Sequence, residues 1–210
     1  MTTTTLIAFH GDPKIKGKYL RRVQRHRKAD ELIRGTGFNN GKGCAVGCTL
    51  NKYDHAAYET ELGIPKVLAR LEDVMFERME LDEAMKWPTR FLSAVPVGAD
   101  LSMVWPRFAV WLMRETATKT KRESSKKACE SVAAAYERHI AGSPPSVGEW
   151  RKIHAAAYAA AEAAAYADAA ADAAYSAAYS ADAAYSARAK ALAKMADLVR
   201  KEIPIPFIGE

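Results

Sequence analysis

An alanine-rich tract between residues 155 and 193 constrains the fold of this chain more than any other feature. It reads AAAYAAAEAAAYADAAADAAYSAAYSADAAYSARAKALA, and 24 of its 39 residues are alanine, with no glycine or proline. Because alanine has the highest intrinsic helix propensity, the tract predicts a helix. Its side chains are small, so this helix must approach a neighbour closely or stand in solvent. Nothing in the tract performs chemistry.

Signals before and after the tract set the expected length of this helix. Ser143-Pro-Pro145 interrupts helical structure, and Ser146 followed by Glu149 fits a capping box. Since no stop signal follows until Pro204, we expect one helix of about 55 residues, roughly 80 Å long. It can pack on its own domain, pair with a second copy to form a homodimer, or project as a rod. We therefore divide the chain into a helical body, residues 1–142, and a part with the long helix and a short tail, residues 143–210.

The fold class predicted for the body is mainly α, a compact multi-helix arrangement. Glycine, proline and capping residues bound the expected helices, which cover residues 13–34, 55–62, 65–79, 82–95 with a break at Trp87-Pro88, about 100–115 and 125–141. Thr2–Phe9 is β-branched and apolar, which is typical of one short strand or an extended arm. Residues 116–125 are polar and basic and are interpreted as a mobile linker. Three of the four tryptophans lie between residues 87 and 111, so the main core is expected at residues 60–115.

Positive charge is concentrated near the N-terminus. Residues 1–50 carry 10 Lys/Arg against 3 Asp/Glu, and the whole chain has a net charge of +6. A surface of this sign is typical of proteins that bind nucleic acid or acidic proteins, although a solvated helix face is the plainer interpretation. Asp12-Pro13 predicts the start of the helix that is expected to end at Gly35. Its polar face carries the candidate partner-binding residues Lys14, Lys18, Arg21, Arg22, Arg25 and Lys28.

The glycine- and cysteine-rich segment GTGFNNGKGCAVGC, residues 35–48, is the one part that resembles a chemical site. Its five glycines predict unusual backbone angles or close backbone approach. Three roles for Cys44 and Cys48 are open. They can be small buried hydrophobes, which is the preferred interpretation; one can be a nucleophile paired with His55 or His10; or both can bind zinc with His55 and a distant ligand such as His10. We predict no metal and no cofactor, since no P-loop, GxGxxG, HExxH or GxSxG motif is present.

The segments LIAFHGDPKIKGKYLRRVQRHRKADELIRGTG, GKGCAVGCTLNKYDHAAYETELGIPKVLARLEDVMFE and WPTRFLSAVPVGADLSMVWPRFAVWLM lie within about residues 5–115. They resemble a widespread family of uncharacterised proteins from phages, prophages and bacterial accessory DNA. The alanine-rich part is similar to the variable tail that such proteins often carry. The resemblance implies a mobile-element context and brings no active-site residues. Small phage accessory proteins often bind and block a host machine, for instance a CRISPR surveillance complex.

Three functional hypotheses follow. The first is a non-enzymatic binding protein that blocks a host defence complex, with a host protein or ribonucleoprotein as its partner. The second is a small cysteine-dependent hydrolase or transferase that uses Cys44 or Cys48. The third is a nucleic-acid-binding protein that uses the basic helix. The odd number of cysteines favours the reducing cytoplasm of a bacterial host, and the lack of an apolar run of about 18 residues predicts no membrane span.

Overall fold

A computed structural model describes residues 6–175 of the chain, with side chains described through residue 163. These residues form eight α-helices and one two-stranded sheet, which confirms the mainly α fold class. The described chain forms two compact units, residues 6–104 and residues 105–175. The division expected at residue 142 falls inside the second unit, between two helices that pack against each other. No described helix is both long and apolar enough to cross a membrane.

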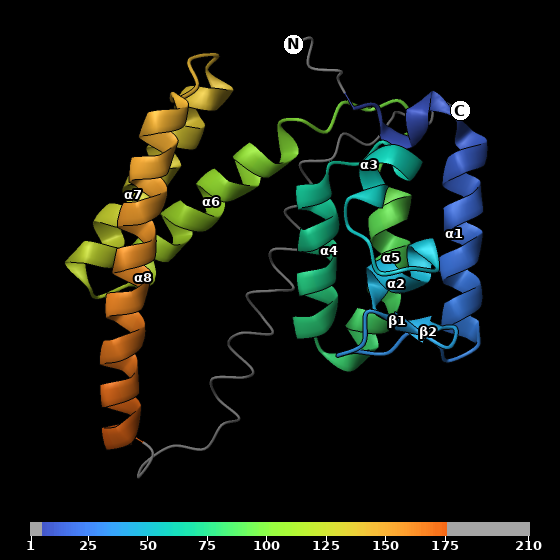
Figure 1. Cartoon of the computed structure of the whole chain (residues 1–210), viewed down its shortest axis with the longest axis horizontal. Helices are drawn as coiled ribbons and strands as arrows, with labels where there is room; N and C mark the ends of the chain where they lie inside the picture. Colours follow the sequence, from blue (N-terminus) through green and yellow to red (C-terminus); the bar gives the residue numbers. More distant parts are fainter. Residues whose placement is uncertain (1–5, 176–210) are drawn as a thin grey trace. The chain divides into compact units, whose positions relative to one another are not determined.

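The first unit is a small helical bundle. Its helices α1 and α4 lie on either side of α2 and α5 (Figure 1). The elements are a 3-10 turn at Ala8–Gly11, α1 (Pro13–Lys28), β1 (Phe38–Asn39), β2 (Lys42–Gly43), α2 (Ala45–Leu50), α3 (Ala57–Leu62), α4 (Lys66–Arg78) and α5 (Leu81–Ala94). Its core is broader than the predicted range of 60–115, because Phe9, Tyr19 and Val46 are fully buried alongside Trp87 and Phe91.

Capping residues set several helix ends as expected. The Asp12 side chain accepts a hydrogen bond from the Lys14 backbone N–H at 2.7 Å, and Pro13 opens α1. The Asp54 carboxylate accepts from the N–H of Ala56 at 2.9 Å, just before the start of α3. Gly63 ends α3 with a φ of 63°. This left-handed conformation costs a glycine least, which is why the chain can turn there.

Helix α1 is shorter than predicted: it ends at Lys28, not Arg34. Asp30 adopts a left-handed φ of 51°, and the following residues leave the helix. The Ile33 N–H donates to the Gly43 carbonyl at 2.9 Å, and the Gly43 N–H donates to the Glu31 carbonyl at 3.0 Å. These backbone groups therefore have hydrogen-bond partners at β2. In a longer α1 they would have needed partners within the helix itself.

Residues 6–9, the described part of the segment expected to form a short strand or an extended arm, contain no strand. Ile7 makes a single antiparallel bridge with Asp100, and Ala8–Gly11 then forms a 3-10 turn. Phe9 and His10 have positive φ values of 54° and 51°. Because Phe9 is fully buried, its packing can hold this strained turn in place. Residues 2–5 of the predicted strand lie outside the described part.

Helix α5 continues through Pro88, so the predicted break at Trp87-Pro88 is wrong. A proline in a helix interior removes one backbone donor and crowds the preceding turn. The neighbouring tryptophan compensates: Trp87 is 1% exposed, and its indole N–H donates to the Glu72 carbonyl at 3.1 Å. Its ring also packs on Phe91 at 5.8 Å between centroids. Burial of this aromatic face holds α5 together across the proline.

The second unit contains α6 (Val104–Lys119), α7 (Glu123–Ile140) and α8 (Val147–Tyr175). Only residues 120–122 separate α6 from α7, so the predicted linker over 116–125 is wrong. The polar residues on either side of this short connection lie on helices and not in a linker. Arg114 of α6 donates to both carboxylate oxygens of Glu137 of α7 at 2.9 Å, and this contact joins the two helices. The side chains of α6, α7 and α8 also line a small, mostly apolar pocket of about 180 Å³ that is open to solvent.

The start of α8 confirms the predicted capping box. The Ser146 N–H donates to Glu149 Oε2 at 2.7 Å, and the Glu149 N–H donates to Ser146 Oγ at 3.2 Å. Hydrogen bonds with the Ser146 backbone, Arg138 and the Ser146 side chain lower the pKa of Glu149 to about 2. The alanine-rich helix is described through Tyr175. The predicted continuation toward Pro204 lies outside the described residues.

Candidate functional sites

The glycine–cysteine segment folds into a tight hairpin followed by α2. Strands β1 and β2 pair in antiparallel register, with Phe38 opposite Gly43. A Cβ on Gly43 or Gly47 would overlap the Gly37 carbonyl oxygen, and a Cβ on Gly37 would overlap the Tyr53 ring. The segment therefore uses glycine for close backbone approach, which confirms that part of the prediction.

Cys44 lies at the junction between this hairpin and α2. Its backbone N–H donates to the Thr36 carbonyl at 2.8 Å, and its Sγ lies 3.4 Å from the Gly37 carbonyl oxygen. As the N-cap of α2, Sγ also accepts from the Gly47 N–H at 3.4 Å. Cys44 is 1% exposed, so the hairpin holds this sulfur in one buried position.

Two carboxylates of α4 lie beside Cys44. One ligand atom from each of Cys44, Asp73 and Glu77 lies within 4.8 Å of the others, and we name these three residues the thiol–carboxylate cluster. Asp73 Oδ2 accepts from the Tyr53 hydroxyl at 3.0 Å and lies 3.0 Å from His55 Nε2. Glu77 Oε2 accepts from the Gly35 N–H at 2.9 Å.

One oxygen of the cluster has no hydrogen-bond partner in the part of the chain that the structure describes. Asp73 is 7% exposed, and its Oδ1 atom is buried without a hydrogen bond. A buried carboxylate oxygen without a hydrogen bond costs free energy. Oδ1 is therefore an acceptor within the cluster that a ligand could satisfy. The Tyr53 ring meets His55 edge to face at 4.9 Å, and both side chains bind the other Asp73 oxygen. The arrangement orients the Asp73 carboxylate, while Oδ1 accepts no hydrogen bond from the described residues.

A second buried carboxyl group lies next along α4. Glu72 is 0% exposed and accepts from the Tyr58 hydroxyl at 2.6 Å. Burial raises the pKa of Glu72 to about 8, and the charge of Asp73 acts in the same direction, whereas the Tyr58 hydrogen bond opposes it. Glu72 is therefore largely protonated at neutral pH, and it joins α3 to α4 inside the core.

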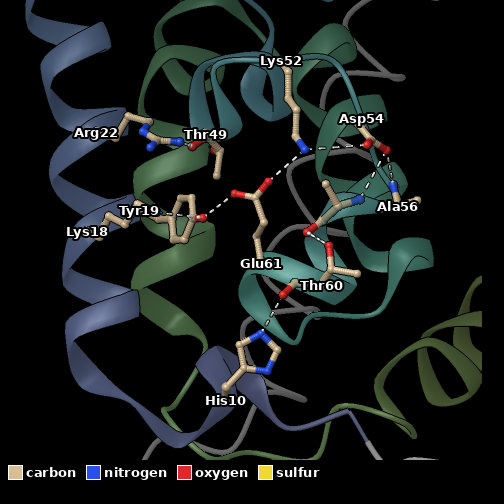
Figure 2. A network of polar contacts seen from close by, with 11 residues as sticks. His10, Lys18, Tyr19, Arg22, Thr49, Lys52, Asp54, Ala56, Thr60 and Glu61 are labelled. Carbon is tan, nitrogen blue, oxygen red and sulfur yellow. Dashed lines mark hydrogen bonds and ion pairs between the residues drawn. The ribbon is translucent and has the colours of Figure 1, made fainter.

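Among the described residues, no hydrogen bond joins Cys44 or Cys48 to a histidine. His10 Nε2 lies 3.1 Å from the Thr60 carbonyl (Figure 2), Cys48 Sγ lies 3.3 Å from the Gly43 carbonyl, and His55 binds Asp73. Cys44, Cys48, His55 and His10 thus form no common ligand set within the described part of the chain. Because α2 ends at Leu50, Cys48 and His55 do not lie on one continuous helix.

The thiols are poorly suited to act as nucleophiles. Burial raises the pKa of Cys44 well above its usual value, and the Asp73 carboxylate acts in the same direction. Burial likewise raises the pKa of Cys48 to about 12. Because the thiolate is the reactive form, both groups are protonated and unreactive at neutral pH.

We expect alkylation of the native protein to follow this order of burial. Cys129 is half-buried, whereas Cys44 and Cys48 are fully buried, so iodoacetamide should modify Cys129 first. Mass spectrometry of peptides after a timed reaction measures the modification of each residue. The unfolded protein, in which all three should react, is the control. Fast modification of Cys44 in the native protein would contradict its burial.

The basic face of α1 is the second candidate site. The structure exposes five of the six residues that the sequence placed on this face: Lys14, Lys18, Arg21, Arg25 and Lys28. Lys18, Arg21, Arg25 and Lys28, with Gln24, line an open hollow of about 560 Å³. Lys14, Arg21, Arg25 and Lys28 form no ion pair with any side chain that the structure describes. These four side chains, which we name the α1 cation row, present positive charge to solvent.

Arg22 differs from the other predicted partner-binding residues. It is half-buried, donates to the Thr49 carbonyl at 3.0 Å and lies over the Tyr19 ring at 5.1 Å. Figure 2 shows Tyr19 pointing to Glu61, whose carboxylate also pairs with Lys52 at 2.9 Å. Arg22 and Tyr19 therefore hold α1 on α2 and α3, and Arg22 serves the fold.

The acidic residues of the cluster were missed from the sequence. Asp73 and Glu77 are four residues apart, so a helix places them on one face, and this spacing was the available signal. Burial does not follow hydrophobicity along this helix, because Val74 is 50% exposed whereas Asp73 is 7% exposed. Comparisons with protein-family models, curated proteins and solved structures found no match. Function is therefore inferred from the chemistry of the two sites.

Proposed function

We propose that the protein is a non-enzymatic accessory protein of a phage or other mobile element that binds and blocks a host defence ribonucleoprotein, as anti-CRISPR inhibitors do. The supporting observation is the α1 cation row: Lys14, Arg21, Arg25 and Lys28 are exposed and lack described ion-pair partners. Unpaired cations on one helix face attract phosphate groups. In such a complex, the RNA backbone provides these negatively charged phosphate groups.

The helix that carries the row is held rigidly. Lys16 Nζ donates to the carbonyls of Ser93 and Val95 at 2.8 and 2.7 Å, at the C-terminal end of α5. Tyr19 and Arg22 anchor the middle of α1. A rigid helix loses little conformational entropy when it binds, so more of its electrostatic attraction is available as affinity.

A cysteine-dependent activity has weaker support. Cys44 and Cys48 are buried and protonated, and no histidine among the described residues forms a hydrogen bond with either thiol and so could accept its proton. A nucleophilic thiol needs an adjacent base and access to substrate. Binding through α1 requires no such group.

Neutralising the α1 cation row should abolish blocking. In the combined variant Lys14→Gln, Arg21→Gln, Arg25→Gln and Lys28→Gln, affinity for the defence complex should fall by about 30-fold or more, because four side chains can no longer neutralise phosphate groups. A bacterial strain with an active CRISPR system, infected with a targeted phage, measures blocking as plaque number. The wild-type protein should restore plaques, and the variant should not.

A matched control removes the same charge elsewhere. Lys119, Lys121, Lys126 and Lys127 are exposed lysines on and between α6 and α7, and their combined change to Gln should leave blocking intact. If both four-residue variants lost blocking equally, blocking would depend on the net charge of the protein and not on the position of the cations. Loss of blocking in Cys48→Ala with an intact fold would favour the cysteine hypothesis. Tight binding of the protein to free RNA or DNA, without blocking, would favour the simple nucleic-acid-binding hypothesis.

A further inference from the structure

We propose that Cys44, Asp73 and Glu77 form a zinc site that joins the glycine hairpin to α4. The three ligand atoms lie within 4.8 Å of one another, as they must to surround one ion. The residues come from two separate segments, the N-cap of α2 and the C-terminal half of α4. The site is independent of the α1 cation row and goes beyond the proposed function.

The donor set fits zinc by its chemistry. Zinc accepts both thiolate and carboxylate ligands in tetrahedral geometry, whereas calcium and magnesium require oxygen ligands alone. The buried sulfur favours zinc among the common divalent ions. Glu77 is half-buried, so the cluster reaches the edge of the protein surface, and a water molecule can fill the fourth position.

The unpartnered Asp73 oxygen provides a second, independent observation. Tyr53 and His55 both bind Oδ2. Oδ1 is buried without a hydrogen bond from any described residue, and Asp73 as a whole is 7% exposed. Protein carboxylates that bind metal typically have hydrogen bonds that orient them. Tyr53 and His55 orient Asp73 in this way, and a metal ion would satisfy Oδ1.

The scaffold holds the sulfur in place before an ion arrives. The Cys44 N–H donates to the Thr36 and Gly37 carbonyls at 2.8 and 3.1 Å, and Gly37 lies under the Tyr53 ring. When zinc binds, the Cys44 S–H bond breaks, a sulfur–zinc bond forms and the proton passes to solvent. The ion then links the hairpin to α4 and stabilises this unit.

Cobalt titration of the purified full-length protein tests the site. After treatment with a chelator, Co²⁺ should bind at one ion per chain and give the near-ultraviolet thiolate-to-cobalt absorption, and added Zn²⁺ should remove that absorption. Native mass spectrometry should count one zinc per chain, and Zn²⁺ should raise the melting temperature. The absence of thiolate absorption in the wild-type protein would overturn the proposal.

Variants identify the ligands. Cys44→Ser should lose the absorption, whereas Cys129→Ser, which lies outside the cluster, should keep it. Glu77→Gln alters a half-buried side chain and should fold; its Zn²⁺ affinity should fall by about tenfold or more. The Glu77 variant decides the test if the Cys44 variant does not fold. Unchanged Zn²⁺ affinity in Glu77→Gln, or absorption lost in Cys48→Ala and kept in Cys44→Ser, would overturn the assignment.

Discussion

Replacing Gly47 with alanine should destabilise the first unit by about 3 kcal/mol or more, since the new methyl group would overlap the Gly37 carbonyl oxygen. That carbonyl belongs to backbone, which also accepts the Cys44 N–H, so it cannot move without breaking the hairpin. Gly47 lies inside α2, where alanine would otherwise be favoured by about 1 kcal/mol. Urea unfolding followed by circular dichroism measures the change.

Gly17 provides the matched control. It also lies inside a helix of the first unit, but a Cβ there would meet only the flexible end of the Arg21 side chain at 3.0 Å. Gly17→Ala should therefore leave stability unchanged or raise it by up to about 1 kcal/mol. If both variants were equally stable, close packing of the hairpin on α2 would be excluded.

The second large effect is expected at Trp87. Trp87→Ala should cost about 4 kcal/mol, because it removes the largest side chain of the buried core and leaves a cavity beside Phe91. Trp87→Phe should cost less, on the order of 2 kcal/mol, because it keeps a ring but leaves the Glu72 carbonyl without its indole donor. Denaturant unfolding of the three proteins gives both values.

The Trp87→Ala variant also tests why α5 runs through Pro88. If burial of Trp87 holds the helix across the proline, amide hydrogen exchange in Trp87→Ala should accelerate more in α5 than in α1. Trp111→Ala is the control, since Trp111 is half-buried and belongs to the second unit. Equal exchange in α1 and α5 of the Trp87 variant would indicate only global loss of stability.

Local signals predicted most helix ends but not the elements that long-range contacts decide. Asp12-Pro13, Gly63 and the Ser146–Glu149 box act through neighbouring residues, and the structure confirms them. Residues 29–34 leave α1 because Gly43, which is distant in sequence, supplies their backbone partners. Pro88 stays helical because Trp87 is buried against α4. No local pattern contains such contacts.

The candidate sites show the same division. Cys44 and its glycines stand out in the sequence because their composition is unusual. Asp73 and Glu77 do not, because isolated acidic residues on a helix usually face solvent. The basic residues of α1 were recognised from their spacing, yet only the fold separates the exposed Arg21 and Arg25 from Arg22, which binds the Thr49 carbonyl.

The salt dependence of binding to the purified defence complex tests the proposed role of the α1 cation row most directly. We expect the logarithm of the affinity of the wild-type protein to fall linearly with the logarithm of salt concentration. Neutralising Lys14, Arg21, Arg25 and Lys28 should reduce that slope by about 3, because each phosphate group that a cation neutralises contributes roughly 0.7. An affinity that does not change with salt, or a slope that is the same in both proteins, would contradict binding through this face.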